Sequence, residues 1–293
     1  MSAEIIDGKA IADAIRREVK NETELLKKTK GITPGLAFLL VGDNPASQSY
    51  VRSKGKACEE VGFFSLTEVM PADTKEETIL SKIEEFNHCT DIHGILVQLP
   101  LPKQINEQKI IEAINPAKDV DGFHPINIGK LMIGLETFLP CTPAGIQELL
   151  LRSGNDPAGK HVVVAGRSNI VGKPIANILL QKKQGANAVV TMVHTGVHDL
   201  RPYTLQADIL IAAIGKPQII TGEMVREGVV VIDVGINRIE DSTAQKGYRI
   251  VGDVDFDSVQ KKAKAITPVP GGVGPMTIAM LVRNTLKSAK AIS

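Results

Sequence analysis

The chain has 293 residues, a formal net charge of +1, no tryptophan and only 3% aromatic residues. It is long enough for one large or two ordinary domains with a buried core. Near-neutral charge and few aromatic side chains argue against a nucleic-acid partner or an anionic membrane. No window approaches the roughly 20 apolar residues of a membrane span, and nothing near Glu4 suggests a signal peptide. We therefore expect a cytoplasmic enzyme. Three dispersed cysteines (Cys58, Cys89, Cys141) predict neither a metal site nor a disulfide framework.

The first half of the chain alternates between helical and strand patterns. Ile11, Ile15 and Val19 recur at helical spacing, and similar patterns follow along the chain. They predict helices over 8–29, 46–60, 75–87 and 104–114, and strands over 36–41, 63–69 and 94–99. Strands that alternate with helices in this way are typical of a parallel sheet with helical crossovers.

Three polar residues of this half are expected at one edge of the sheet. Tyr50 and Lys54 are four residues apart on one helix face, just after a strand. Gln98 follows another strand, and ligands of open α/β sheets bind at the carboxyl ends of strands. An exposed lysine and a packed tyrosine would explain the same pattern, so spacing alone leaves both interpretations open.

The segment DVDGFHP (119–125) contains two carboxylates and a turn glycine. It lacks the other ligands of a calcium loop, so a metal site is not predicted. Asp121 is suited to paired hydrogen bonds from a donor-rich heterocycle, or equally to a simple Asx-turn. The spacing does not separate these two roles.

The second half predicts another α/β unit. Its expected strands cover 162–165, 188–193, 209–214 and 229–234, with a helix over 175–184. A glycine- and proline-bearing segment near 120–160 is expected to join the two units. The chain ends with the loop ITPVPGGVGPMT (266–277) and an apolar helix over 276–290, which we expect to return to the first unit.

A glycine turn begins the second unit. Gly166 ends a strand predicted to be buried on both faces, and a helix follows near Pro174. A strand, a tight turn and a helix N-terminus together form an anion site that suits a dinucleotide pyrophosphate. The G-x-G-x-x-G pattern is incomplete, because Ser168 and Val171 replace its later glycines. Taken alone, the motif only modestly favours dinucleotide binding over a plain strand-turn-helix.

The end of the next strand favours NADP over NAD. A free ribose 2′-hydroxyl usually meets Asp or Glu there, but this strand ends in His194 and Thr195. The first carboxylate after them is Asp199, whereas Arg167 beside the turn suits a 2′-phosphate.

Seven blocks of the chain resemble the bifunctional methylenetetrahydrofolate dehydrogenase/cyclohydrolase family. They are YVRSKGKACEEVG (50–62), GILVQLPLP (94–102), KDVDGFHP (118–125), PCTPAG (140–145), VVVAGRSNIVGKP (162–174), VIDVGIN (231–237) and TPVPGGVGPMT (267–277). The resemblance implies two α/β domains with a folate cleft between them. The first, over 1–120, is the folate and catalytic domain, completed by the C-terminal helix 276–293. The second, over 140–270, is a Rossmann-type NADP-binding domain, through which a homodimer assembles.

The resemblance also implies site residues. It makes Lys54 the catalytic lysine, with Tyr50, Gln98 and Asp121 beside it. The substrate-binding residues that it implies are Ser47, Tyr50, Gln98, Leu99, Asp121, Pro270 and Gly271. The cofactor-binding residues that it implies are Gly166, Arg167, Ser168, Thr195, Ile236 and Thr277.

The implied activity has two steps. NADP-dependent oxidation of 5,10-methylenetetrahydrofolate gives the 5,10-methenyl cation, and hydrolysis of that cation gives 10-formyltetrahydrofolate. The alternatives are a dehydrogenase without the hydrolase step and a non-catalytic NADP-binding protein. A short-chain dehydrogenase also has Tyr-x-x-x-Lys, but its glycine turn precedes that pair, whereas Gly166 follows it.

Overall fold

The computed structural model describes residues 2–243 and 247–292, and the chain divides into two compact units. The three-stranded unit contains Asp13–Cys141 and the residues from Ile278 onward. The six-stranded unit contains Thr142–Thr277 and the residues up to Ala12.

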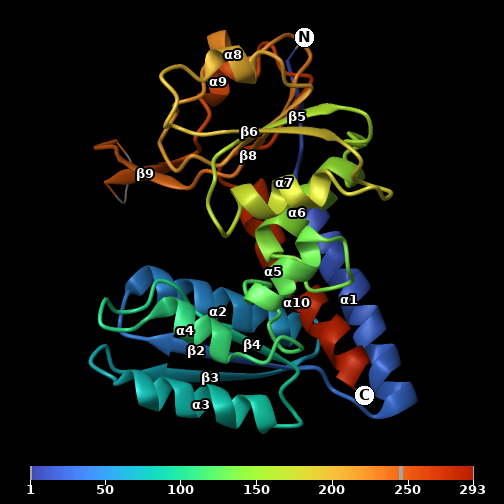
Figure 1. Cartoon of the computed structure of the whole chain (residues 1–293), viewed down its shortest axis with the longest axis vertical. Helices are drawn as coiled ribbons and strands as arrows, with labels where there is room; N and C mark the ends of the chain where they lie inside the picture. Colours follow the sequence, from blue (N-terminus) through green and yellow to red (C-terminus); the bar gives the residue numbers. More distant parts are fainter. Residues whose placement is uncertain (1, 244–246, 293) are drawn as a thin grey trace. The chain divides into compact units, whose positions relative to one another are not determined.

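The three-stranded unit has a parallel sheet in the order β3-β2-β4. Its elements are α1 (Gly8–Lys30, from Asp13), β2 (Gly35–Val41), α2 (Pro45–Glu60), β3 (Phe64–Met70), α3 (Glu76–His88), β4 (Gly94–Val97), α4 (Glu107–Ala113), α5 (Pro125–Met132) and α10 (Val273–Ile292, from Ile278). Every residue of β2 is buried, as expected of a central strand covered on both faces by α2 and α3 (Figure 1).

The strand order of this unit determines where a ligand can bind. From β2 the chain crosses through α2 to β3 on one side, and then through α3 to β4 on the other side. The crossovers therefore diverge at the carboxyl ends of β2 and β4. Such a topological switch point is the usual ligand site of an open α/β sheet.

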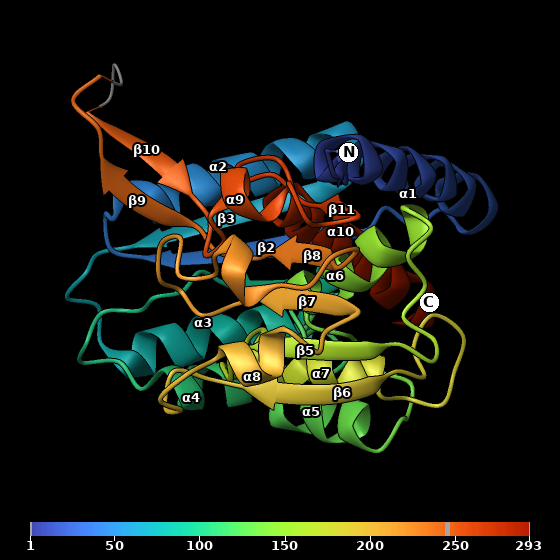
Figure 2. The same ribbon diagram turned by 90° about the horizontal axis from the view of Figure 1, so that it is seen from above.

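The six-stranded unit has a parallel sheet in the order β1-β11-β8-β7-β5-β6. Its elements are β1 (Glu4–Ile5), α6 (Cys141–Arg152, from Thr142), β5 (His161–Ala165), α7 (Gly172–Leu179), β6 (Val189–Val193), α8 (Arg201–Thr204), β7 (Ile209–Ala212), η1 (Gly222–Met224), β8 (Val230–Asp233), β9 (Asn237–Glu240), β10 (Tyr248–Val251), α9 (Phe256–Val259) and β11 (Ala265–Ile266). Strands β5 to β8 lie side by side in Figure 2, with β6 at the edge. The switch point of this sheet lies between β5 and β7.

The predicted α/β class is confirmed, with several differences in detail. The helix expected over 175–184 is α7, which begins at Gly172 and ends at Leu179. The residues up to Ala12, expected in the first domain, belong to the six-stranded unit because β1 pairs with β11. The glycine- and proline-bearing segment near 120–160, expected to join the two units, contains the helices α5 and α6. Pro125 begins α5, a position where the missing N–H of proline costs nothing. The strand expected over 94–99 ends at Val97, before the cis peptide bond of Leu99–Pro100.

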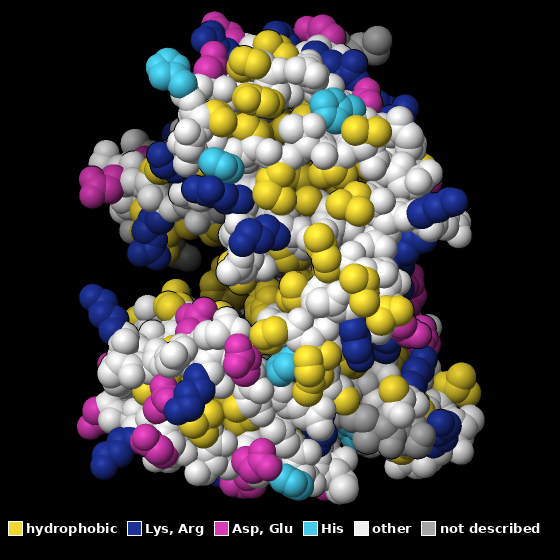
Figure 3. Space-filling view, in the orientation of Figure 1, with side chains coloured by type: hydrophobic (Ala, Val, Ile, Leu, Met, Phe, Trp, Pro, Cys, Tyr) yellow, Lys and Arg dark blue, Asp and Glu magenta, His cyan; other side chains and the backbone are white. Residues whose placement is uncertain are grey.

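In the face drawn in Figure 3, basic and acidic side chains both occur over the surface and intermingle. Among the helices of the described residues, none combines the length and the apolarity needed to cross a bilayer.

Candidate active site and cofactor pocket

Helix α2 presents the lysine at the switch point of the three-stranded unit. Asn44 caps the helix by accepting the N–H groups of Ala46 and Ser47, at 2.9 and 3.2 Å. From this start, Tyr50 and Lys54 follow Ser47 at intervals of three and four residues, which places all three near one helix face. Ser47 and Lys54 are buried, whereas Tyr50 is 48% exposed.

Gln98 holds the Lys54 amine from the end of β4. The Lys54 Nζ donates to Gln98 Oε1 at 3.0 Å. The Gln98 Nε2 donates to the backbone oxygen of Leu99 at 2.7 Å, and this bond turns the amide oxygen toward the lysine. A neutral amide therefore orients the amine without adding a negative charge. Gln98 itself follows the last residue of β4, which places it at the switch point with α2.

The loop that carries Asp121 lies beside β4. Ile95 donates its N–H to the Lys118 oxygen at 2.8 Å, and an isolated parallel bridge joins Ile95 to Asp119. Because the loop continues parallel to β4, it brings Asp121 toward the same edge as Gln98.

Asp119 fixes the shape of this loop. One carboxylate oxygen accepts the N–H groups of Gly122 and Phe123, at 3.1 and 3.3 Å. The other accepts the His124 N–H and the Asn127 side chain, both at 2.8 Å. Asp119 is 2% exposed, and three of the four hydrogen bonds that it accepts are buried, so these donors depend on it. The sequence reasoning missed this role, because it assigned no separate function to the first carboxylate of the motif.

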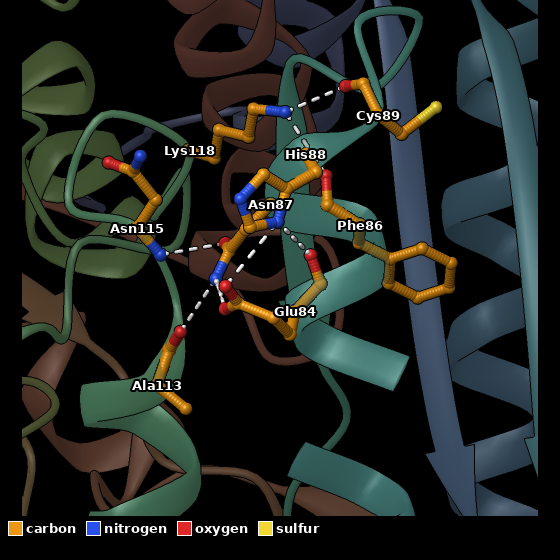
Figure 4. A network of polar contacts seen from close by, with 8 residues as sticks. All are labelled: Glu84, Phe86, Asn87, His88, Cys89, Ala113, Asn115 and Lys118. Carbon is orange, nitrogen blue, oxygen red and sulfur yellow. Dashed lines mark hydrogen bonds and ion pairs between the residues drawn. The ribbon is translucent and has the colours of Figure 1, made fainter. Parts of the chain in front are cut away.

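A second network holds the segment before the loop (Figure 4). Asn87, at the end of α3, donates to the Ala113 oxygen at 2.8 Å and accepts the Asn115 N–H at 2.9 Å. The Lys118 Nζ donates to the backbone oxygens of Phe86 and Cys89, at 3.1 and 2.8 Å. Burial lowers the pKa of Lys118. The end of α3 thus anchors the chain directly before Asp119.

Asp121 and Cys141 share a low-dielectric environment. Burial raises the pKa of Asp121, while the positive charge of Lys54 acts in the opposite direction. Burial also raises the pKa of Cys141 well above its usual value, and its thiol donates to the Val120 oxygen at 3.3 Å. Cys141 is therefore a neutral packed thiol and not a nucleophile. Within the described part of the chain, no group of three His, Cys, Asp or Glu side chains gathers as metal ligands.

The glycine turn of the six-stranded unit is closely packed. A Cβ on Gly166, which has φ +136°, would lie 2.0 Å from the Ala213 oxygen. A Cβ on Gly172 would lie 2.4 Å from the Gly166 oxygen. The Ser168 Oγ accepts the N–H groups of Val171 and Gly172, at 3.1 and 3.3 Å, at the start of α7. Gly172 lies one residue after the position of the third glycine in G-x-G-x-x-G, and this close backbone contact requires a glycine there.

A pocket of about 250 Å³ opens at this turn. Its lining residues are Gly166, Arg167, Ser168, His194, Thr195, Ala213 and Ile214. The pocket lies at the carboxyl ends of β5, β6 and β7, as expected for a nucleotide at the switch point. Backbone crowding at a glycine turn beside an arginine fits a phosphate-bearing cofactor. Sequence reasoning missed Ala213 and Ile214, although their place directly after β7 could have indicated them.

Asp199, the first carboxylate after β6 in the sequence, is hydrogen-bonded outside the pocket lining. Asp199 accepts the Arg201 N–H and its Nε, both at 2.9 Å, and this arginine lowers the pKa of Asp199. The side chain of Asp199 is therefore engaged by Arg201, and the lining residues of the pocket include no Asp or Glu.

The remaining predicted residues of this unit lie outside that lining. Ile236 follows β8 and is 56% exposed. Thr277 is on α10, with its hydroxyl 2.9 Å from that of Thr142. Pro270 follows a cis peptide bond, and the Gly271 oxygen accepts the Lys9 N–H at 3.1 Å.

Comparison with known proteins agrees with this geometry. Residues 6–121 match the catalytic domain of tetrahydrofolate dehydrogenase/cyclohydrolase, and residues 140–293 match its NAD(P)-binding domain. A protein of Syntrophus aciditrophicus named bifunctional protein FolD is 59% identical over 99% of this chain and 98% of its own length. The FolD structure from Campylobacter jejuni is 52% identical, with a TM-score of 0.93 and 99% of both chains covered. The Trypanosoma brucei FolD structure, complexed with NADP cofactor and inhibitor, is 40% identical, with a TM-score of 0.93 over 99% of this chain and 98% of its own. The chain therefore belongs to the tetrahydrofolate dehydrogenase/cyclohydrolase family.

Proposed function

We propose that this chain oxidises 5,10-methylenetetrahydrofolate with NADP and then hydrolyses the 5,10-methenyl product to 10-formyltetrahydrofolate. The observation that carries this proposal is the hydrogen bond between Lys54 and Gln98 at the switch point of the three-stranded unit. The oxidation step needs only a bound and oriented substrate. The hydrolysis step also needs a group that transfers protons, and the buried amine of Lys54 is suited to that role.

Asp121 binds the pterin in this proposal. Its carboxylate offers two acceptors to the paired N–H donors of the heterocycle. Burial raises the pKa of Asp121 and so disfavours its ionised form. Hydrogen bonds donated by a bound substrate act in the opposite direction and stabilise the carboxylate that accepts them. Ser47, Tyr50 and Leu99 complete the folate-binding residues in the three-stranded unit.

Lys54 is the catalytic residue of the hydrolysis. Water adds to the methenyl carbon and loses a proton. The hydroxyl of this adduct then loses its proton to form the formyl C=O, the bond from the carbon to one ring nitrogen breaks, and that nitrogen gains a proton, so that one proton is released overall. Lys54 exchanges these protons, and Gln98 keeps its Nζ in one direction. The preceding oxidation needs no base at the carbon, since nitrogen lone pairs stabilise the developing cation. When bound, NADP accepts the hydride that leaves the methylene carbon.

The pocket at the glycine turn holds the cofactor. Gly166 and Ser168 form the turn against its phosphates, and Arg167 with Thr195 recognises the 2′-phosphate. The support is the shared lining of one pocket and the engagement of Asp199 by Arg201. Ile236 and Thr277 approach the nicotinamide. The three-stranded unit is thus the folate and catalytic domain, and the six-stranded unit is the NADP-binding domain.

The protein works as a cytoplasmic homodimer assembled through the six-stranded units. Strand β6 is an edge strand, and Val189 and Met192 on it are 66% and 38% exposed. An uncovered edge with apolar side chains is suited to pairing with a second copy. Light scattering of the purified chain tests this assembly, and a monomeric mass would contradict it.

A spectroscopic assay with 5,10-methylenetetrahydrofolate tests the function, run in parallel with NADP and NAD. Reduced cofactor, together with a methenyl product that decays faster than in buffer, is the expected result. Reduction without accelerated decay would leave a dehydrogenase alone and remove Lys54 from its role. Cofactor binding without turnover would leave only a nucleotide-binding protein.

A further inference from the structure

A buried carboxylate outside the pocket at the glycine turn connects two segments that lie next to that pocket. Asp253 follows β10 and is fully buried. One of its oxygens accepts the N–H groups of Ile214 and Gly215, at 2.5 and 2.8 Å. The other accepts the side-chain amide of Asn237 at 2.8 Å. Nothing in the proposed chemistry uses this carboxylate directly.

The partners of Asp253 belong to the surroundings of the cofactor. Ile214 lines the pocket together with Arg167 and Thr195. Asn237 begins β9 and directly follows Ile236, the residue assigned above to the nicotinamide. One side chain therefore fixes both the pocket wall after β7 and the segment after β8.

A second buried carboxylate fixes Asp253 itself. Asp233, at the end of β8 and 4% exposed, accepts the N–H groups of Asp253 and Val254 at 2.9 and 3.0 Å. The packing around both carboxylates admits only glycine at two positions. A Cβ on Gly252 would lie 1.7 Å from Asp233 Oδ2, and one on Gly235 would lie 2.3 Å from Asp253 Oδ1. The network thus holds one backbone arrangement at the ends of three strands.

From this arrangement we propose that Asp253 is a positioning residue for cofactor binding, acting through Ile214 and Asn237. The inference rests on the proposed function of the pocket as the NADP site. Loss of the carboxylate leaves three donors without their acceptor, and the freed backbone after β7 no longer shapes the pocket wall. The folate-side residues Lys54, Gln98 and Asp121 make no contact in this network.

The test uses the two activities of the full-length chain separately. Hydrolysis of 5,10-methenyltetrahydrofolate supplied directly requires no NADP, so it serves as an internal control. In Asp253→Ala we expect the KM for NADP to rise at least about tenfold, with hydrolysis within about twofold of the unaltered protein. Asp253→Asn keeps one acceptor for the backbone and should lose only about threefold. Asp257→Asn, an equal charge change on the exposed surface of α9, should alter neither activity.

Asn237→Ala keeps the inference testable where Asp253→Ala does not fold, because it removes only one bond of the network. It should raise the KM for NADP about threefold. An unchanged KM in folded Asp253 and Asn237 variants would overturn the inference, as would an equal loss of both activities. Calorimetric titration of the unaltered protein with NADP separates the two hypotheses. If the unaltered protein binds no NADP, the proposed function fails. If the unaltered protein and the Asp253 variants bind NADP with equal affinity, only the inference about Asp253 fails.

Discussion

The amine of Lys54 and the side-chain oxygen of Gln98 lie 3.0 Å apart, although 44 residues separate them in the chain. They meet because α2 follows β2 and Gln98 follows β4, and these strands are neighbours with diverging crossovers. This contact connects the strand order directly to the proposed hydrolysis.

Replacement of Lys54 should abolish the hydrolase and spare the cofactor site. In Lys54→Met we expect at least about a hundredfold loss of methenyltetrahydrofolate hydrolysis, since general acid–base catalysis contributes on that order. Binding of NADP, measured by calorimetry, should stay unchanged. Lys56→Met changes an exposed lysine of the same helix and should keep full activity. Undiminished hydrolysis in Lys54→Met would remove this lysine from the mechanism.

Replacement of Arg167 should change cofactor preference. In Arg167→Ala we expect the KM for NADP to rise about tenfold or more, because a charge-assisted hydrogen bond to the 2′-phosphate is lost. The KM for NAD, which lacks that phosphate, should change little. The control is Lys182→Ala, which removes an exposed cation of the same unit. Equal losses for the two cofactors would exclude a 2′-phosphate role.

Gly166 and Gly159 separate backbone strain from steric contact. Both have positive φ, at +136° and +70°. A Cβ at Gly166 would collide with the Ala213 oxygen, whereas a Cβ at Gly159 would have no neighbour within 4 Å. Gly159→Ala should therefore cost only the left-handed conformation, about 1 kcal/mol of unfolding free energy. Gly166→Ala must also displace the chain after β7, so NADP affinity should fall at least about tenfold. Urea unfolding and NADP titration measure the two effects. Similar behaviour of both variants would mean that the contact has no consequence.

Asp119 should be more important for stability than its single charge suggests. In Asp119→Asn, the new amide nitrogen faces N–H donors that the carboxylate now satisfies. We expect the free energy of unfolding to fall by about 2–3 kcal/mol. Asp156→Asn is the matched control, because exposed Asp156 accepts the Ala158 N–H and asparagine retains one oxygen for it. A neutral Asp119→Asn would show that the loop does not depend on both oxygens.

The buried Asp233 should make stability depend on pH. Burial raises the pKa of Asp233 from 3.8 to about 7, so between these values the folded state binds a proton that the unfolded state has lost. The contribution of this group to stability is present at low pH and is lost as the pH rises toward 7. Relative to Asp233→Asn, the unaltered protein should therefore lose about 2 kcal/mol of unfolding free energy between about pH 5 and 7.5. Urea unfolding at both pH values measures this difference, and a constant difference would contradict the raised pKa.

The sequence by itself determined the α/β class and most helices and strands, because apolar periodicity and glycine turns are local properties. Gly166, Arg167 and Thr195 were recognisable as neighbours for a similar reason, since strand ends of a parallel sheet meet at one edge. The same rule predicted that Tyr50, Lys54 and Gln98 lie at one edge of the other sheet.

Only the tertiary structure decided which distant segments pair and which buried groups depend on them. The pairing of β1 with β11 joins segments about 260 residues apart, and no local pattern encodes such a partner. Asp119 and Asp253 appear in the sequence as ordinary turn carboxylates. Their importance comes from the N–H groups that folding buries around them, which lose water and must then find an acceptor in the protein.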